Sequence, residues 1–171
     1  MLTMIIRPAQ AAEFARVADL HLASRAHTYS AMLPPGAFDG VDPVAHRARL
    51  RERLAAEAET HLLSVALDGP EIVGFTYVGP ADEPLARELH QIHVAPSRKG
   101  TGVGKALMRA ALDGFRSGGA ERAYLWVIEG NDRAITFYER GGWTPEGTVR
   151  EQPMGNAPTR QLRYEIDLRR G

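Results

Sequence analysis

The chain has 171 residues with 21 basic and 21 acidic side chains, so its formal net charge at pH 7 is zero, and it has no cysteine. A neutral chain has no overall field that draws it to nucleic acid or to a membrane surface, and without cysteine it forms neither disulfides nor thiolate metal sites. No apolar stretch approaches the roughly 20 residues that span a bilayer, and the N-terminus has no signal pattern. We therefore expect a cytoplasmic enzyme or binding protein, one domain over residues 1–171, without nucleic-acid or membrane partners.

The first third of the chain predicts one strand and two helices, with a loop between the helices. The expected strand covers residues 4–7, the helices cover 10–24 and 42–59, and the loop covers 29–40. Prolines and glycines break the loop sequence YSAMLPPGAFDG. Asp42 followed by Pro43 is typical of a helix start, since one caps the first turn and the other suits its first position.

The rest of the chain predicts mainly strands, with two further helices among them. The segments HLLSVAL and IVGFTYVG, separated by DGPE, are typical of an antiparallel hairpin. The expected strands cover residues 61–67, 72–79, 88–96, 124–128, 143–150 and 160–168, and the expected helices cover about 103–115 and 131–143. Gly141 is the expected C-cap of the last helix. This element order indicates the α/β class with a partly antiparallel sheet.

A glycine-rich segment, SRKGTGVGKAL at residues 97–107, lies between the last strand of the first group and an apolar helix. It places glycine at every second position between the only two lysines of the chain. Free backbone N–H groups of such a turn and of the first helical turn can converge on a diphosphate. Two nucleotide-binding patterns do not fit. The triphosphate pattern G-x-x-x-x-G-K-[S/T] needs a hydroxyl where Ala106 stands, and the dinucleotide pattern G-x-G-x-x-G needs glycine where Lys105 stands. A glycine turn without a ligand is the alternative.

Two motifs together resemble the GNAT superfamily of acetyl-CoA-dependent N-acetyltransferases. They are VAPSRKGTGVGKALM at 94–108, a strand end followed by a glycine turn and a helix, and LWVIEGNDRAITFYERGGW at 125–143. The order of elements matches that family over essentially the whole chain. The resemblance implies a single GNAT-like α/β domain with a mixed, mostly antiparallel sheet of about six or seven strands and four main helices. Its two central strands would splay apart to form the acetyl-CoA cleft.

The resemblance also implies which residues hold acetyl-CoA. They are Ile92, His93, Val94, Lys99, Gly100, Thr101, Gly102, Val103, Gly104, Lys105, Asn131 and Tyr138. Main-chain groups of Ile92 and Val94 would pair with the pantetheine arm, and the N–H of Val94 would stabilise the oxyanion. Asn131 would hydrogen-bond the arm, and a plain helix N-cap is its alternative role. Lys99 departs from the family, which prefers Gln or Arg there; it keeps the charge but loses the planar guanidinium.

Acetyl transfer to an amine needs a base for the ammonium, a donor for the oxyanion of the tetrahedral intermediate and an acid for the leaving thiolate. By resemblance Tyr138 is the acid. Glu88 and His90 alternate along the strand 88–96, so both would lie on one face as candidate bases, or simply as a polar strand edge. By the same alternation His93 would lie on the opposite face. The six histidines are scattered, and no metal site is indicated.

In the family, two loops wall the acceptor site, and here they correspond to residues 25–40 and 150–159. The first is apolar, and we expect Tyr29, Met32 and Phe38 to bind the acceptor, with Asp39 the only carboxylate. That composition disfavours a polycation and favours a small primary amine or an amino-acid-like acceptor. The alternatives are an acetyltransferase acting on peptide N-termini or lysines, and a non-catalytic CoA-binding module. A homodimer through strand or helix packing is also consistent with the sequence.

Overall fold

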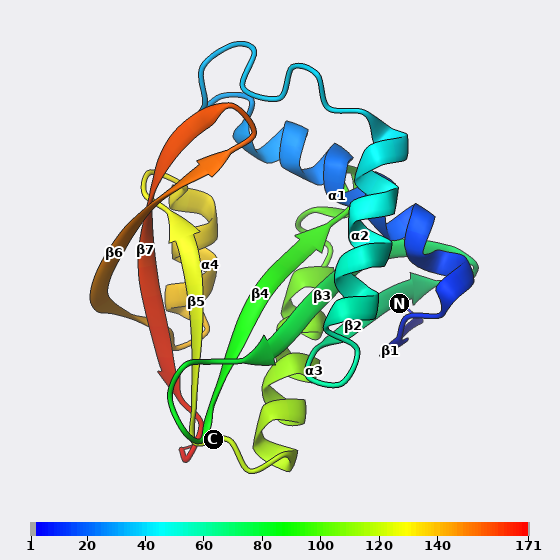
Figure 1. Ribbon diagram of the computed structural model, residues 1–171. Helices are drawn as coiled ribbons and strands as arrows, with labels where there is room; N and C mark the ends of the chain where they lie inside the picture. Colours follow the sequence, from blue (N-terminus) through cyan, green and yellow to red (C-terminus); the bar gives the residue numbers. More distant parts are fainter. Residues whose placement is uncertain (1–2, 171) are drawn as a thin grey trace.

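A computed structural model describes residues 3–170 of the chain. Its centre is a seven-stranded sheet of order β1-β2-β3-β4-β5-β7-β6, with helices on both faces (Figure 1). The strands are β1 (Met4–Pro8), β2 (Leu62–Asp68), β3 (Glu71–Pro80), β4 (Ala86–Val94), β5 (Arg122–Ile128), β6 (Thr144–Met154) and β7 (Ala157–Asp167). The helices are α1 (Phe14–Tyr29), α2 (Pro43–Ala56), α3 (Val103–Ser117) and α4 (Asp132–Arg140), and two 3₁₀ turns cover Ala11–Glu13 and Pro96–Arg98. The predicted α/β class, strand number and helix number are confirmed.

The helix starts follow the local chemistry that the sequence indicated. The Asp42 side chain accepts a hydrogen bond from the N–H of Val44, and Pro43 occupies the first turn of α2. The first helix is displaced from its predicted position, because it begins at Phe14, after a 3₁₀ turn, and continues past Ser24 to Tyr29. Tyr29 therefore lies on a helix rather than in a loop, and its position is fixed by the backbone of α1.

The sheet divides between β4 and β5. These two strands are parallel and pair only where Ala86 to Glu88 meet Arg122 to Tyr124. Beyond that point they diverge, while β5 pairs along its whole length with β7 on its other side. Figure 1 shows the resulting wedge between β4 and β5. The predicted splaying of the central strands is confirmed, and it leaves backbone groups of β4 available to a ligand.

A β-bulge in β4 changes which residues share a face. Tyr77 of β3 pairs with Gln91 and Val78 pairs with Leu89, so His90 is an extra residue that has no partner opposite. The regular alternation of side chains is therefore reversed past His90. The prediction that His93 lies opposite Glu88 and His90 is wrong for this reason, since all three line one cavity. Simple alternation could not reveal the bulge.

The core lies on both faces of the sheet. On one face, α3 and α4 cover a cluster that contains Leu89, Leu112 and the fully buried Trp143. On the other face, α1 packs Val17 and Leu20 against β2 and β3. The two layers hold the divergent ends of β4 and β5 between them, so the wedge is supported by packed helices on each side.

The C-terminal hairpin is longer than the sequence predicted. The expected polar loop over 150–159 is almost wholly strand, and only Gly155 and Asn156 form the turn between β6 and β7. Pro153 and Pro158 donate no ladder hydrogen bond, and the hairpin accommodates them because they face each other at its tip, on the edge of the sheet. Asn156 also binds the loop that follows α1: its N–H donates to the Ala37 carbonyl at 2.6 Å.

Candidate active site

The glycine-rich segment forms a turn that opens directly into α3. Gly100 and Gly102 have φ values of +77° and +95°, a backbone conformation that residues other than glycine rarely adopt. Gly102 caps α3 without any side-chain hydrogen bond, so the first-turn N–H groups remain free for a ligand. Arg98 anchors the turn by ion pairs to Asp68 and Glu71 at 2.6 and 2.8 Å. The loop thus has a backbone geometry suited to an anion at a helix N-terminus.

A first cavity of about 1020 Å³ runs along this turn, with β4 and α3 on one side and α4 on the other. Most of the residues predicted to hold acetyl-CoA line it: Ile92, His93, Val94, Lys99, Gly100, Gly102, Gly104, Lys105, Asn131 and Tyr138. Two of the predicted residues do not. Thr101 turns its hydroxyl to the Arg98 carbonyl, and Val103 is fully buried against β2 and β3. Val103 therefore contributes to the core.

The charge around this cavity is basic. Lys105, Arg109 and Arg133 line it, and none of them forms an ion pair with another described residue. The Lys99 ammonium donates to the Thr28 hydroxyl at 3.0 Å, and burial, with the charge of Arg133, lowers its pKa. The sequence reasoning missed Arg109, although it follows Lys105 at helical spacing. These free cations and the open helix N-terminus fit the phosphate groups of a CoA molecule.

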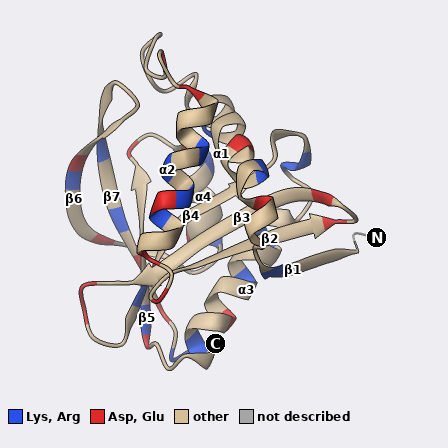
Figure 2. Cartoon of the chain, turned by 45° about the vertical axis from the view of Figure 1, so that its right-hand side comes forward, with Lys and Arg blue, Asp and Glu red and all other residues tan. Residues whose placement is uncertain are grey.

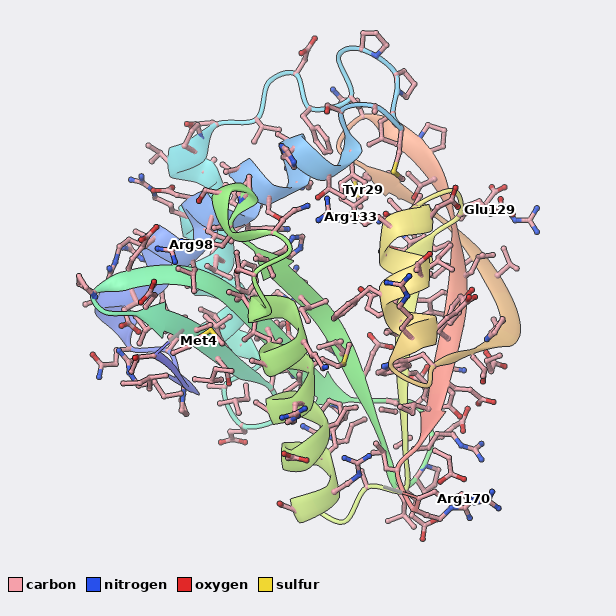
Figure 3. The ribbon with its side chains drawn as sticks, turned by 180° about the vertical axis from the view of Figure 1, so that it is seen from behind. Met4, Tyr29, Arg98, Glu129, Arg133 and Arg170 are labelled. Carbon is pink, nitrogen blue, oxygen red and sulfur yellow. The ribbon has the colours of Figure 1, made fainter. Side chains whose placement is uncertain are left out.

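Two side chains of the α4 region lie on the far wall of the first cavity. Asn131 is buried, and its side-chain oxygen accepts from the N–H of Ala134 at 3.3 Å, so it does cap α4. Its contact with a pantetheine arm stays a prediction. Tyr138 also lines the cavity; burial, and then its neighbour Tyr29, raise its pKa. The phenol therefore keeps its proton at neutral pH and can act as an acid. Figure 3 shows Tyr29 and Arg133 at the mouth between α1 and α4.

A second cavity, of about 440 Å³, lies on the α1 side of β4 and contains Glu88 and His90. It shares Tyr29 and His93 with the first cavity, so the two meet there. Nδ1 of His90 lies 2.6 Å from Oε2 of Glu88, while Nε2 of His90 is buried without a partner. Burial acts to raise the Glu88 pKa, but His90 and the charges of Arg150 and Arg163 prevail and lower it. Glu88 is thus an ionised carboxylate that His90 holds in position.

The residues predicted to bind the acceptor are only partly brought together. Tyr29 lines both cavities, whereas Met32 and Phe38 line neither. Phe38 instead supports a residue that the sequence reasoning missed, because the guanidinium of Arg25 lies 4.6 Å from the centre of its ring. Arg150 was missed in the same way. Neither arginine stands in a motif, and the contacts that turn them toward the cavity join segments far apart in the sequence.

The described part of the chain contains neither a cluster of metal-ligating side chains nor a long apolar helix. Within residues 3–170, no three His, Asp or Glu side chains gather in a way that could hold a metal ion. No helix in that range is both long and apolar enough to cross a membrane.

Known proteins resemble the chain in sequence and in fold. Residues 27–143 match the sequence model of the acetyltransferase (GNAT) family. The chain is 38% identical over 77 residues to mycothiol acetyltransferase of Corynebacterium efficiens. The aligned residues make up 45% of this chain and 26% of that protein, so the chain spans about a quarter of that relative's length. It is 34% identical over 115 residues to N-alpha-acetyltransferase RimI of Mycobacterium tuberculosis, 66% of this chain and 69% of that protein. The crystal structure of PaiA N-acetyltransferase from Thermoplasma acidophilum with coenzyme A matches with a TM-score of 0.80 at 17% identity, over 96% of this chain and 99% of that one.

Proposed function

The chain belongs to the acetyltransferase (GNAT) family, and we propose that it is an N-acetyltransferase that transfers an acetyl group from acetyl-CoA to the primary amine of a small molecule by direct attack of the amine. We propose further that residues 1–171 act as one catalytic domain. The observation that carries the proposal is the junction of the two cavities at Tyr29 and His93. A donor along the glycine turn and an amine beside Glu88 would meet at this junction.

Each step of the reaction has a residue suited to it. When bound, acetyl-CoA supplies an acetyl group that is activated as a thioester. Glu88, ionised and held by His90, accepts the proton of the ammonium directly or through water, because an amine attacks only when neutral. The N–H of Val94 would stabilise the developing negative charge on the carbonyl oxygen. The C–N bond forms, the C–S bond breaks, and Tyr138 gives its proton to the departing sulfur.

A small acceptor is favoured by the roof over the second cavity, where the β6–β7 turn reaches the loop after α1. The N–H of Asn156 donates to the Ala37 carbonyl, and its side-chain amide donates to the Asp39 carbonyl at 3.3 Å. Figure 1 shows the two segments in contact above the wedge. A roof of this kind restricts the length of chain that can enter, so a small molecule fits better than a polypeptide.

A peptide α-amine is the second candidate acceptor. The observation in its favour is the similarity to N-alpha-acetyltransferase RimI over 69% of that protein. Release of CoA thiol from acetyl-CoA, measured over small amines, amino acids, polyamines and N-terminal peptides, distinguishes the two. Turnover of small amines supports our proposal, and turnover of peptides alone supports the second candidate. No turnover of any amine, with acetyl-CoA still bound, would leave a non-catalytic binding module.

Gly155→Ala tests the roof. Gly155 has a φ of +58°, and an added Cβ would overlap the Ala37 carbonyl oxygen and the ring of Phe38. We expect the turn to lift from the loop and the acceptor KM to rise about tenfold, while the Kd for acetyl-CoA stays unchanged. Steady-state kinetics and calorimetry measure the two quantities.

Gly69→Ala is the matched control, because Gly69 has the same φ of +58° and no atom near its added Cβ. It carries the same backbone strain at the β2–β3 turn, away from the cavities. An equal rise of the acceptor KM in both variants would contradict the roof.

His90→Leu tests whether His90 positions Glu88 and lowers its pKa. Without the hydrogen bond and charge of His90, the effect of burial on Glu88 prevails and its pKa rises. A carboxylate base works only when deprotonated, so activity falls as the pH drops through the pKa of Glu88. Because this pKa is higher in the variant, we expect its activity to fall at a higher pH than that of the unmodified protein. The pH profile of kcat at saturating acceptor measures the shift. His90→Gln, which keeps a donor, should shift the profile less, and an unmoved acid limb in His90→Leu would contradict the role.

A further inference from the structure

The second cavity carries an unbalanced positive charge. Its ionisable lining comprises three arginines and a single carboxylate, besides histidines. Burial, with neighbouring positive charges, lowers the pKa of His21 to about 2 and that of His93 to about 4, so both are neutral at neutral pH. Figure 2 shows positions of Lys and Arg on α2 and on β7 in blue. An acceptor that was only a cation would be repelled here.

Two of the three arginines have no counter-ion. Arg53 is occupied, because its Nε lies 2.6 Å from a carboxylate oxygen of Glu57. Arg25 and Arg150 form no ion pair with any described residue. Glu88 is close enough to Arg150 to favour its charged form, but that carboxylate is already bound to His90. Burial lowers the pKa of both arginines, so each carries a desolvation cost that no ion pair within the described residues offsets.

Both guanidinium groups lie over aromatic rings. Arg25 lies 4.6 Å from the centre of the Phe38 ring, and its Nε is buried without a hydrogen-bond partner. Arg150 lies 4.1 Å from the centre of the Trp126 ring, and its Nε donates to the Gln161 side chain at 2.9 Å. A guanidinium that lies over a ring still has N–H groups for other partners, and arginine can bind a carboxylate through two of these groups at once.

We propose that the acceptor is a small amine that carries a carboxylate, as free α-amino acids do, and that Arg25 and Arg150 bind this carboxylate while the amine faces Glu88. This inference rests on the proposed function and narrows its substrate class. The cavity of about 440 Å³ under the roof has room for a molecule of that size. The two arginines come from α1 and β6, so the carboxylate would also tie the roof hairpin to the helix beneath it.

The test compares each of several free α-amino acids with its own carboxamide, which keeps the amine and side chain but lacks the negative charge. In the unmodified protein we expect kcat/KM to favour the acids by about 100-fold. In Arg25→Gln and in Arg150→Gln we expect that preference to fall about tenfold, mainly through the acceptor KM, with the Kd for acetyl-CoA unchanged. Arg51→Gln on the exposed face of α2 removes the same charge outside both cavities and should leave the preference unaltered.

A binding measurement separates this inference from the proposed function. The thermal shift of the CoA-loaded protein with each acid and with its amide needs no turnover. A shift with acids that both arginine variants lose supports the carboxylate site even if no acetyl transfer is detected. Carboxamides that are turned over or bound as well as the acids would overturn it, as would arginine variants that lower the values for acids and amides equally.

Discussion

Tyr138→Phe should lower kcat by about 10²- to 10⁴-fold while the Kd for acetyl-CoA stays nearly the same. The phenol lines the first cavity, and burial, followed by the proximity of Tyr29, raises its pKa, so at neutral pH it is a donor. Removing the hydroxyl takes away the acid for the departing sulfur but keeps the aromatic ring, whose centre lies 6.3 Å from the ring centre of Trp143. Pre-steady-state kinetics and calorimetry give the chemical rate and the affinity separately.

Tyr124→Phe makes the same chemical change outside the cavities, where the phenol donates to Glu83. Its kcat should stay close to that of the unmodified protein. If Tyr138→Phe turned over at the normal rate, Tyr138 would have no part in proton transfer. A parallel loss of kcat and of acetyl-CoA affinity would indicate that Tyr138 only shapes the cavity.

The features that sequence alone predicted correctly depend on short-range chemistry. The Asp42–Pro43 helix start, the Asn131 cap and the glycine turn before α3 each follow from backbone needs that neighbouring residues meet. The splayed sheet came from the resemblance of two motifs and is confirmed by the pairing of β4 with β5. These elements place the first cavity, which is why most of the predicted acetyl-CoA residues line it.

What the sequence did not reveal depends on contacts between distant segments. The bulge at His90 is set by the register with β3, and a one-residue slip moves His93 to the face of Glu88. Arg25 and Arg150 can be recognised only from their contacts with the rings of Phe38 and Trp126. The acceptor side is therefore assembled by tertiary packing, whereas most residues of the donor side belong to the two sequence motifs.

The glycine turn should tolerate little change at Gly102, and we expect Gly102→Val to abolish acetyl-CoA binding. Its φ of +95° is severely unfavourable for a β-branched residue, at a cost of about 1–3 kcal/mol or more. To relieve that strain the turn must rearrange, and its N–H groups then no longer converge on the diphosphate. Calorimetry with acetyl-CoA measures the loss, and the melting temperature reports whether the fold is retained.

Gly102→Asn separates strain from obstruction. An added Cβ at Gly102 meets no protein atom within 4 Å, so a side chain there would extend into the space that a ligand would use. Asparagine accepts positive φ more readily than valine, so if backbone strain dominates it should retain more affinity. Equal loss in both variants would assign the effect to obstruction of the diphosphate site. Full affinity in Gly102→Val would mean that the diphosphate binds elsewhere, because neither the φ of this residue nor the space beside it would then matter to the ligand.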